Sequence, residues 1–343
     1  ALARSGVEEL YLPSRLVKIG AYAFYNCHSL RRITCFGRAV DLGAGLFAGV
    51  QTVEYLDITL FSGEKSCLKE LLSELRQTLR VRIREAEPGS GTAVGGTTEE
   101  VTAGTAGETG SRTMAGTTGG AMGRTMAGTP GGTGGKTGGG PTAESREARL
   151  IFPEYYEDSV ENTPARIVSI ETHGCGHRYR YCFQNRVFQY RDYDSIFPHM
   201  KVQEPEALAA ELAVSRLKYP LGLTEAAARE YRAYLAEHWQ AAGQVLIDAD
   251  RLNRDSVTSL DPGQLPWLVE QVLEPMVGDT PETGWDSILS WYISLAQNAG
   301  DPEMVSWLMD YRHRRFGGGR RSGTQSADSP SQPEPRRPRR FQL

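Results

Sequence analysis

The chain has 343 residues, a formal net charge of −4 and five cysteines. Its length allows two domains. The small net charge gives no electrostatic reason to expect nucleic acid or an anionic membrane as a partner. No apolar run is long enough to cross a bilayer, so we expect no transmembrane helix.

Residues 7–58 repeat with a spacing of 23 residues. Three apolar columns recur at this spacing: Val7, Leu30 and Val53; Leu10, Ile33 and Leu56; Leu12, Cys35 and Ile58. A fixed period in this range is typical of a solenoid, whose stacked turns share one continuous core. Because a solenoid needs a polar cap and usually several turns, we also expect further sequence upstream of Ala1.

The segment from Ile19 to Ile33 reads IGAYAFYNCHSLRRI. It resembles the BspA-type leucine-rich repeat, whose pattern is roughly I-G-x-x-A-F-x-x-C-x-x-L-x-x-I. The following turn keeps Gly43 and Phe47 and replaces the cysteine with Val50, which indicates a packing role for this position. The resemblance covers residues 7–58. It implies a right-handed solenoid with short parallel strands, used mostly for protein contact.

Period-two alternation predicts strands near Glu9–Leu12, Arg32–Cys35 and Glu54–Ile58. Leucines at helical spacing then predict a helix from Leu68, with Ser66 as its N-cap. One more strand is expected where Leu79, Val81 and Ile83 alternate with Arg80, Arg82 and Arg84, and we interpret these arginines as a solvated face. Residues 1–87 are therefore predicted to form a solenoid end with a capping helix and strand.

The remaining chain divides by composition. Residues 88–147 are dominated by Gly and Thr and offer too few large apolar side chains to form a core, so we expect a disordered linker. Residues 148–316 are predicted to form a separate domain, first mixed and then α-helical, with paired helices like those of helical repeats. Residues 317–343 are predicted to be a disordered basic tail. The fold class is thus a partial α/β leucine-rich repeat solenoid joined to a mainly α domain.

The segment FPEYYEDSVENTPARIV, from Phe152 to Val168, gives residues 149–316 a second resemblance. It is similar to an uncharacterised α-rich domain that is appended to such repeats in gut Firmicutes. This resemblance implies no activity.

A dense group of histidines and cysteines comprises His173, Cys175, His177 and Cys182. These residue types suit zinc, but their spacing differs from that of a usual zinc knuckle, so zinc stays a minor alternative to no cofactor. A thiol nucleophile at Cys175 with His177 is another alternative, although no third group is recognisable. Nearby tyrosines and arginines, including Tyr179, Arg180 and Tyr193, are interpreted as an alternating surface sheet with solvated arginines.

No motif indicates catalysis, and the function that the sequence favours is protein binding on the strand face. The candidate positions lie between the inward columns: Glu9, Tyr11, Arg32, Thr34, Glu54 and Tyr55. The partner is an unidentified protein, and the alternatives are a metal- or thiol-dependent enzyme at Cys175 and a bacterial surface adhesin. The five cysteines are odd in number and three sit at apolar-looking positions, which indicates reduced thiols and leans towards the cytoplasm. A missing upstream segment leaves a surface location open.

Overall fold

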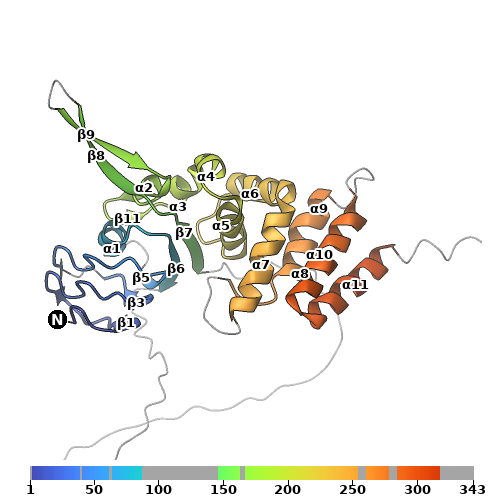
Figure 1. Cartoon of the computed structure of the whole chain (residues 1–343), viewed down its shortest axis with the longest axis horizontal. Helices are drawn as coiled ribbons and strands as arrows, with labels where there is room; N and C mark the ends of the chain where they lie inside the picture. The colour runs from blue at the N-terminus through green and yellow to red at the C-terminus, as the bar shows by residue number, and fades with distance from the viewer. Residues whose placement is uncertain are drawn as a thin grey trace, which may run out of the picture. The chain divides into compact units, whose positions relative to one another are not determined.

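In a computed structural model of the chain, the described residues are 2–38, 41–61, 64–86, 146–162, 167–253, 260–277 and 284–316. The expected linker, apart from residues 146 and 147, and the expected basic tail lie outside these ranges. Figure 1 shows a sheet with short turns at the N-terminal end of the described chain and helices in its C-terminal part.

A five-stranded sheet, in the order β1-β3-β5-β6-β7, forms the first part of the fold. Its strands are β1 (Glu9–Leu12), β3 (Arg32–Phe36), β5 (Tyr55–Phe61), β6 (Leu79–Ala86) and β7 (Glu147–Phe152). The first four strands run parallel, with about one turn of chain between neighbours. The prediction of a solenoid with short parallel strands is therefore confirmed.

The strand register follows the 23-residue repeat. Leu10 pairs with Ile33 and Ile33 with Leu56, so each column becomes a row across the sheet. All three side chains are buried. Burying like residues above one another gives the turns a common core, as the repeat predicts.

The side of the solenoid away from the large sheet carries a second pair of short strands. β2 (Lys18–Ile19) and β4 (Asp41–Leu42) are parallel and pair Ile19 with Leu42. Behind them Phe24 and Phe47 stack with ring centroids 5.4 Å apart. Cys27 is fully buried, in agreement with a packing role for this column.

Helix α1 (Leu68–Glu74) follows β5 and buries Leu68, Leu71 and Leu72 against the solenoid. The helix is shorter than the leucine spacing suggested, and its N-cap residue is Cys67. Ser66 lies one residue earlier, where its hydroxyl accepts a hydrogen bond from the Leu68 amide at 3.4 Å. The predicted strand with alternating arginines is β6.

Strand β7 extends the solenoid sheet from the far side of the linker. It runs antiparallel to β6, from the pair Leu79 and Phe152 to the pair Arg84 and Glu147. The described residues of 2–86 and 146–316 consequently belong to one compact unit. This differs from the expected separate domain at 148–316, because a strand's pairing partner cannot be read from local alternation.

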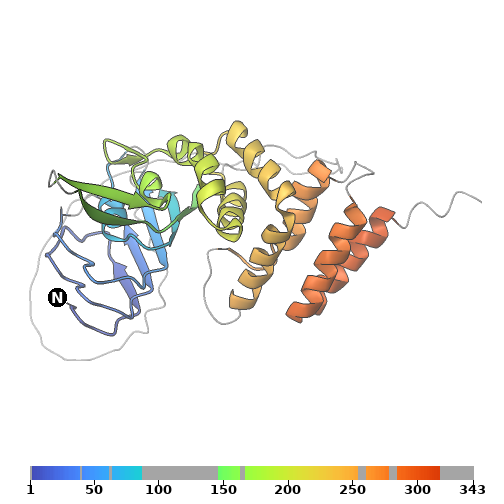
Figure 2. The ribbon, with the colours of Figure 1, turned by 45° about the horizontal axis from the view of Figure 1, so that its top comes forward.

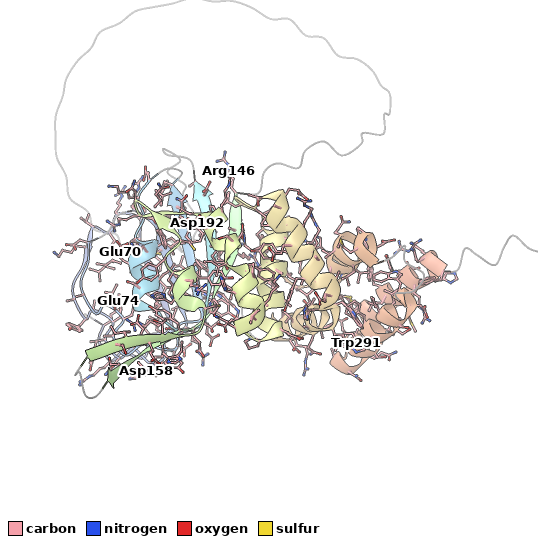
Figure 3. The ribbon with its side chains drawn as sticks, turned by 90° about the horizontal axis from the view of Figure 1, so that it is seen from above. Glu70, Glu74, Arg146, Asp158, Asp192 and Trp291 are labelled. Atoms are coloured by element: carbon pink, nitrogen blue, oxygen red, sulfur yellow. The ribbon has the colours of Figure 1, made fainter. Side chains whose placement is uncertain are left out.

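After β7 the chain forms a two-stranded ribbon of β8 (Tyr156–Asn162) and β9 (Ile167–His173). Figure 3 shows Asp158 on this ribbon. A short helix α2 (Gly176–Tyr179) and a small hairpin of β10 (Phe183–Gln184) and β11 (Val187–Phe188) follow. The expected alternating surface sheet in this stretch is thus replaced by the end of β9, a helix and a hairpin.

The C-terminal part is helical, as predicted. Its elements are α3 (Tyr190–Ser195), α4 (Phe197–Gln203), α5 (Glu206–Lys218), α6 (Glu225–Glu237), α7 (Trp239–Asn253), α8 (Leu265–Trp267), the π-helix η1 (Leu268–Leu273), α9 (Glu274–Val277), α10 (Trp285–Ala299) and α11 (Pro302–Phe316). Thr224 caps α6 by accepting a hydrogen bond from the Ala227 amide at 3.3 Å. Figure 2 shows α10 and α11 side by side. Among the described helices, none has the length and apolar character needed to cross a bilayer.

Candidate functional site

The outward face of the sheet carries the predicted binding positions in ordered rows. The register aligns Glu9, Arg32, Tyr55 and Arg80 in one row and Tyr11, Thr34, Asp57 and Arg82 in the next. Their strand neighbours Leu10, Ile33 and Leu56 point into the core. Because side chains alternate along a strand, these two rows form one continuous surface, which we call the strand face.

Exposure on the strand face decreases from β1 towards β6. Tyr11 is 61% exposed and Glu9 is also exposed, whereas Arg32 and Tyr55 are half-buried. The Arg32 guanidinium bonds the Asp57 carboxylate at 2.9 Å and lies 5.0 Å from the Tyr55 ring centroid. These contacts hold Arg32 in one orientation.

The structure distinguishes between the two neighbouring candidates Glu54 and Tyr55. Tyr55 begins β5 and belongs to the row of Arg32. Glu54 precedes the strand and forms an ion pair with Arg31 at 2.9 Å, to one side of the strand face. Tyr55 is therefore the residue of this pair that contributes to the surface.

Two of the three arginines of β6, Arg80 and Arg82, are ion-paired, which corrects their interpretation as a solvated face. Arg80 forms two hydrogen bonds to Glu211 on α5, at 2.6 and 2.8 Å. Arg82 forms two to Glu147 on β7, at 3.0 and 3.3 Å. Burial acts to lower the pKa of Arg80, but the hydrogen bond and charge of Glu211 outweigh it and raise this pKa. Arg84, at the end of β6, is exposed.

A third arginine, Arg149 on β7, is buried at the same end of the face. It bonds Glu147 at 2.8 Å and Asp261 at 3.0 Å, and its guanidinium lies 3.8 Å from the Tyr219 ring centroid. Tyr219 also donates a hydrogen bond to Asp261. Burial acts to raise the pKa of Asp261, but the bonds from Tyr219 and Arg149 outweigh it and lower this pKa.

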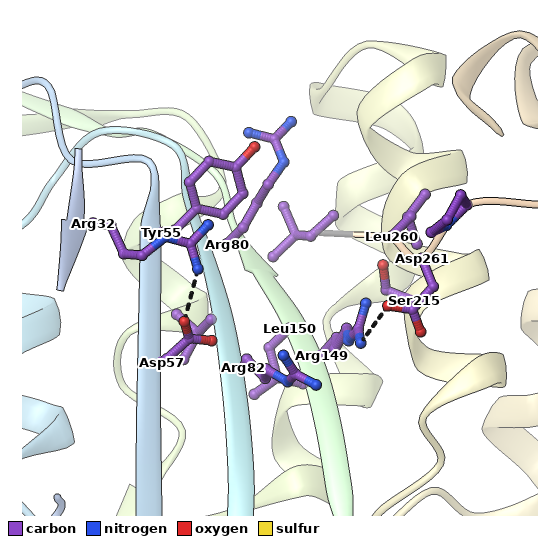
Figure 4. A pocket seen from close by; sticks show the side chains of 13 residues that line it. Arg32, Tyr55, Asp57, Arg80, Arg82, Arg149, Leu150, Ser215, Leu260 and Asp261 are labelled. Carbon is purple, nitrogen blue, oxygen red and sulfur yellow. Dashed lines mark hydrogen bonds and ion pairs between the residues drawn. The ribbon is translucent and has the colours of Figure 1, made fainter. Parts of the chain in front are cut away.

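A cavity of about 100 Å³ lies where the strand face meets α5 and the segment before α8. Figure 4 shows the side chains that line it. From the sheet these are Arg32, Tyr55, Asp57, Arg80, Val81, Arg82, Arg149, Leu150 and Ile151, and from the helical part Ser215, Leu260, Asp261 and Pro262. Two predicted binding residues, Arg32 and Tyr55, therefore form one wall.

The other lining residues could not be found from sequence. Arg149, Ser215 and Asp261 lie far from the repeats in the chain and reach the face only through β7 and the packing of α5 on it. Their local sequence contains no motif that signals a site.

The four candidate metal ligands do not come together as one group in the described chain. The thiols of Cys175 and Cys182 are buried, and that of Cys175 contacts the Met200 sulfur at 3.8 Å. His173 stacks on Tyr156, and His177 packs between Tyr155 and Tyr181. Within the described ranges, no three histidine, cysteine, aspartate or glutamate side chains are grouped as metal ligands.

Burial also makes the two thiols poor nucleophiles. It raises the pKa of Cys182 to about 12 and that of Cys175 further, the latter with help from Glu204. Since the thiolate is the nucleophilic form, neither thiol is activated at neutral pH. The geometry does not favour a thiol-dependent enzyme at Cys175 and His177.

Arg180 and its tyrosine neighbours are buried and not part of a surface sheet. Tyr179 and Tyr193 are fully buried, with ring centroids 4.7 Å apart. Arg180 is 3% exposed.

Comparisons of the chain with family models, with curated proteins and with solved structures give no match.

Proposed function

We propose that this protein is a binding module whose strand face recognises a polypeptide partner. The observation that supports this most directly is Tyr11, which is 61% exposed on the edge strand β1, at one end of an otherwise ordered row. Tyrosine offers a large, amphipathic contact area at low conformational-entropy cost. A tyrosine that is held on a strand and left exposed is therefore suited to contact a partner.

The order of the strand face supports the same proposal. Backbone hydrogen bonds fix β1, β3, β5 and β6 in register, and the bond to Asp57 fixes the Arg32 side chain. A surface held in place before binding loses little conformational entropy when a partner arrives. The resemblance of residues 7–58 to leucine-rich repeats agrees with a role in protein contact.

The test selects peptides from a random displayed library with the full chain as bait. We expect a Glu9→Lys/Tyr11→Ala double variant to bind the selected peptides at least about tenfold more weakly, because it removes an exposed anchor and reverses a charge. Neither side chain is buried, so the thermal unfolding midpoint should stay unchanged. Dissociation constants come from fluorescence anisotropy of the labelled peptides.

The matched control is Tyr22→Ala. Tyr22 is also exposed, at 57%, but lies in a turn outside the sheet strands. The proposal requires Tyr22→Ala to bind like the unaltered chain. Equal affinity of the double variant and the unaltered chain would show that the peptides bind elsewhere, and would refute a recognition role for the strand face.

A further inference from the structure

The cavity at the end of the strand face is large enough for a side-chain end group. Its volume of about 100 Å³ exceeds the roughly 30 Å³ that one water molecule takes in the liquid. One wall is formed by Arg32 and Tyr55, which belong to the surface that we propose contacts the partner. A side chain of a bound polypeptide can thus enter without the polypeptide leaving the strand face.

The hydroxyl of Ser215 lacks a hydrogen-bond partner in this cavity. Ser215 lies on α5 with 0% of its surface exposed, and its Oγ meets no partner among the described residues. Leaving a buried polar group unsatisfied costs about 1–3 kcal/mol. Buried polar groups in folded proteins are almost always bonded, so an unbonded hydroxyl in a cavity wall is available to a polar ligand.

The lining of the cavity holds more cationic than anionic side chains. Four arginines line the cavity, but only two carboxylates do, those of Asp57 and Asp261. The bonded partners of Arg80 and Arg82 are Glu211 and Glu147, which are not part of the lining.

Hydrogen-bond donors also outnumber acceptors in the lining. Arg80 and Arg82 bond their carboxylates through Nε and Nη2, and no hydrogen bond to either Nη1 occurs among the described residues. A guanidinium carries five N–H donors and accepts none. An ionised carboxylate, which only accepts, complements this excess of donors.

Apolar atoms complete the lining and suit a short methylene stem. Leu150, Leu260 and Pro262 contribute to the wall beside the polar groups. Glutamate and aspartate combine such a stem with a terminal carboxylate.

We infer that this cavity binds the carboxylate of an acidic side chain on the polypeptide that the strand face recognises. The inference rests on the proposed function and adds a requirement to it, since the partner must present a glutamate or aspartate at this end of the face. The Ser215 hydroxyl and the free edges of Arg80 and Arg82 donate hydrogen bonds to the carboxylate oxygens.

The first experiment uses a small probe and the full chain. Saturation-transfer NMR titrations compare N-acetyl-glutamate N-methylamide with the corresponding glutamine compound. We expect the glutamate probe to bind and the glutamine probe to bind at least about tenfold more weakly, because only the former carries the charge. Equal affinities would overturn the inference.

Ser215→Ala tests the location of the bound probe. Hydrogen bonds to charged groups are strong, so losing the bond from Ser215 should weaken the binding of the glutamate probe about tenfold. Removing an unbonded hydroxyl should not lower the unfolding midpoint, so folding is not in question. Ser290→Ala is the control, because Ser290 lies half-buried on α10, outside the cavity lining, and bonds the Asp286 carbonyl. An unchanged affinity in Ser215→Ala would place the probe outside the cavity and contradict the inference.

Two further experiments complete the test. One distinguishes an acidic side chain from a free anion as the ligand, and the other distinguishes failure of this inference from failure of the proposed function. Inorganic phosphate is titrated as a competitor, and phosphate that binds more tightly than the glutamate probe would identify a small-anion site instead. In the displayed peptides, replacing the acidic residue by its amide should weaken binding. Peptides that depend on Tyr11 but tolerate this replacement would overturn the inference alone, whereas probe binding without any Tyr11-dependent peptide would overturn both proposals.

Discussion

At the scale of single residues, Arg180 connects three segments of the chain. Its guanidinium donates five hydrogen bonds, between 2.5 and 3.1 Å, to backbone carbonyls of four residues: Leu75, Gln77, Pro153 and Gly176. Leu75 is the C-cap of α1, Pro153 follows β7 and Gly176 begins α2. Arg180 thus joins the solenoid end to the second part of the chain.

The electrostatic environment of Arg180 is unusual for a buried cation. Burial lowers the pKa of Arg180 to about 10, and the group still remains charged at neutral pH. Among the described residues, its hydrogen-bond acceptors are backbone carbonyls rather than carboxylates, and the ring centroid of Tyr155 lies 5.0 Å from the guanidinium carbon. The folded chain stabilises this charge by hydrogen bonding.

We predict that Arg180→Met lowers the free energy of unfolding by about 3–5 kcal/mol, because it leaves several buried carbonyls without donors. Urea unfolding of the full chain, followed by tryptophan fluorescence, measures the change. Arg178→Met is the matched control: Arg178 is exposed two residues away, and its replacement should change stability by less than about 0.5 kcal/mol. Similar losses in both variants would contradict the role assigned to Arg180.

At the scale of the elements, equivalent glycines of successive solenoid turns have different surroundings. Gly20 and Gly43 follow the paired residues Ile19 and Leu42. A methyl group on Gly20 would meet nothing within 4 Å, whereas one on Gly43 would overlap the backbone of Ala21 in the preceding turn. The close stacking of one turn on the next therefore requires a glycine at position 43.

We predict that Gly43→Ala destabilises the chain by about 1–3 kcal/mol, the usual range for an overpacked site. Gly20→Ala should be neutral or slightly stabilising, because alanine restricts the unfolded chain and meets no obstacle in the folded one. Thermal unfolding of both variants gives the comparison. A larger loss in Gly20→Ala than in Gly43→Ala would refute the stacking argument.

Elements that depend on local pattern could be predicted from the sequence, and elements that depend on distant partners could not. The apolar columns of the repeat predicted β1, β3 and β5, because each turn repeats the same inward residues. β6 pairs with β5 on one edge and with β7 on the other, and the chain between β6 and β7 contains no signal for the second pairing. For the same reason, part of the candidate site could not be predicted from the sequence. Ser215 and Asp261 join Arg32 and Tyr55 only through tertiary packing.

At the scale of the whole molecule, the sheet joins the parts on either side of the 88–147 segment. β6 and β7 pair along most of their length, and the Glu85 amide donates to the Arg146 carbonyl at 2.9 Å. Arg80 of β6 adds two bonds to Glu211 on α5. The ends of the two strands are consequently adjacent, although residues 87–144 separate them in sequence.

We predict that replacing residues 87–144 with Asn-Gly leaves the fold intact. Asn-Gly is the dipeptide that two-residue hairpin turns favour, and the antiparallel ends of β6 and β7 are placed to accept such a turn. Shortening the connection reduces the entropy cost of loop closure, so the free energy of unfolding should rise, by up to about 3 kcal/mol. Calorimetry of the shortened and unaltered chains measures the difference.

A Gly/Ser segment of the original length in place of residues 87–144 provides the control, and it should leave stability unchanged because the loop-closure cost depends mainly on length. A shared sheet requires the solenoid and the helical part to unfold together in all three chains, since separating β6 from β7 exposes the core of both. Two independent transitions, or a shortened chain that fails to fold, would instead support the separate domains that the composition of the sequence suggested.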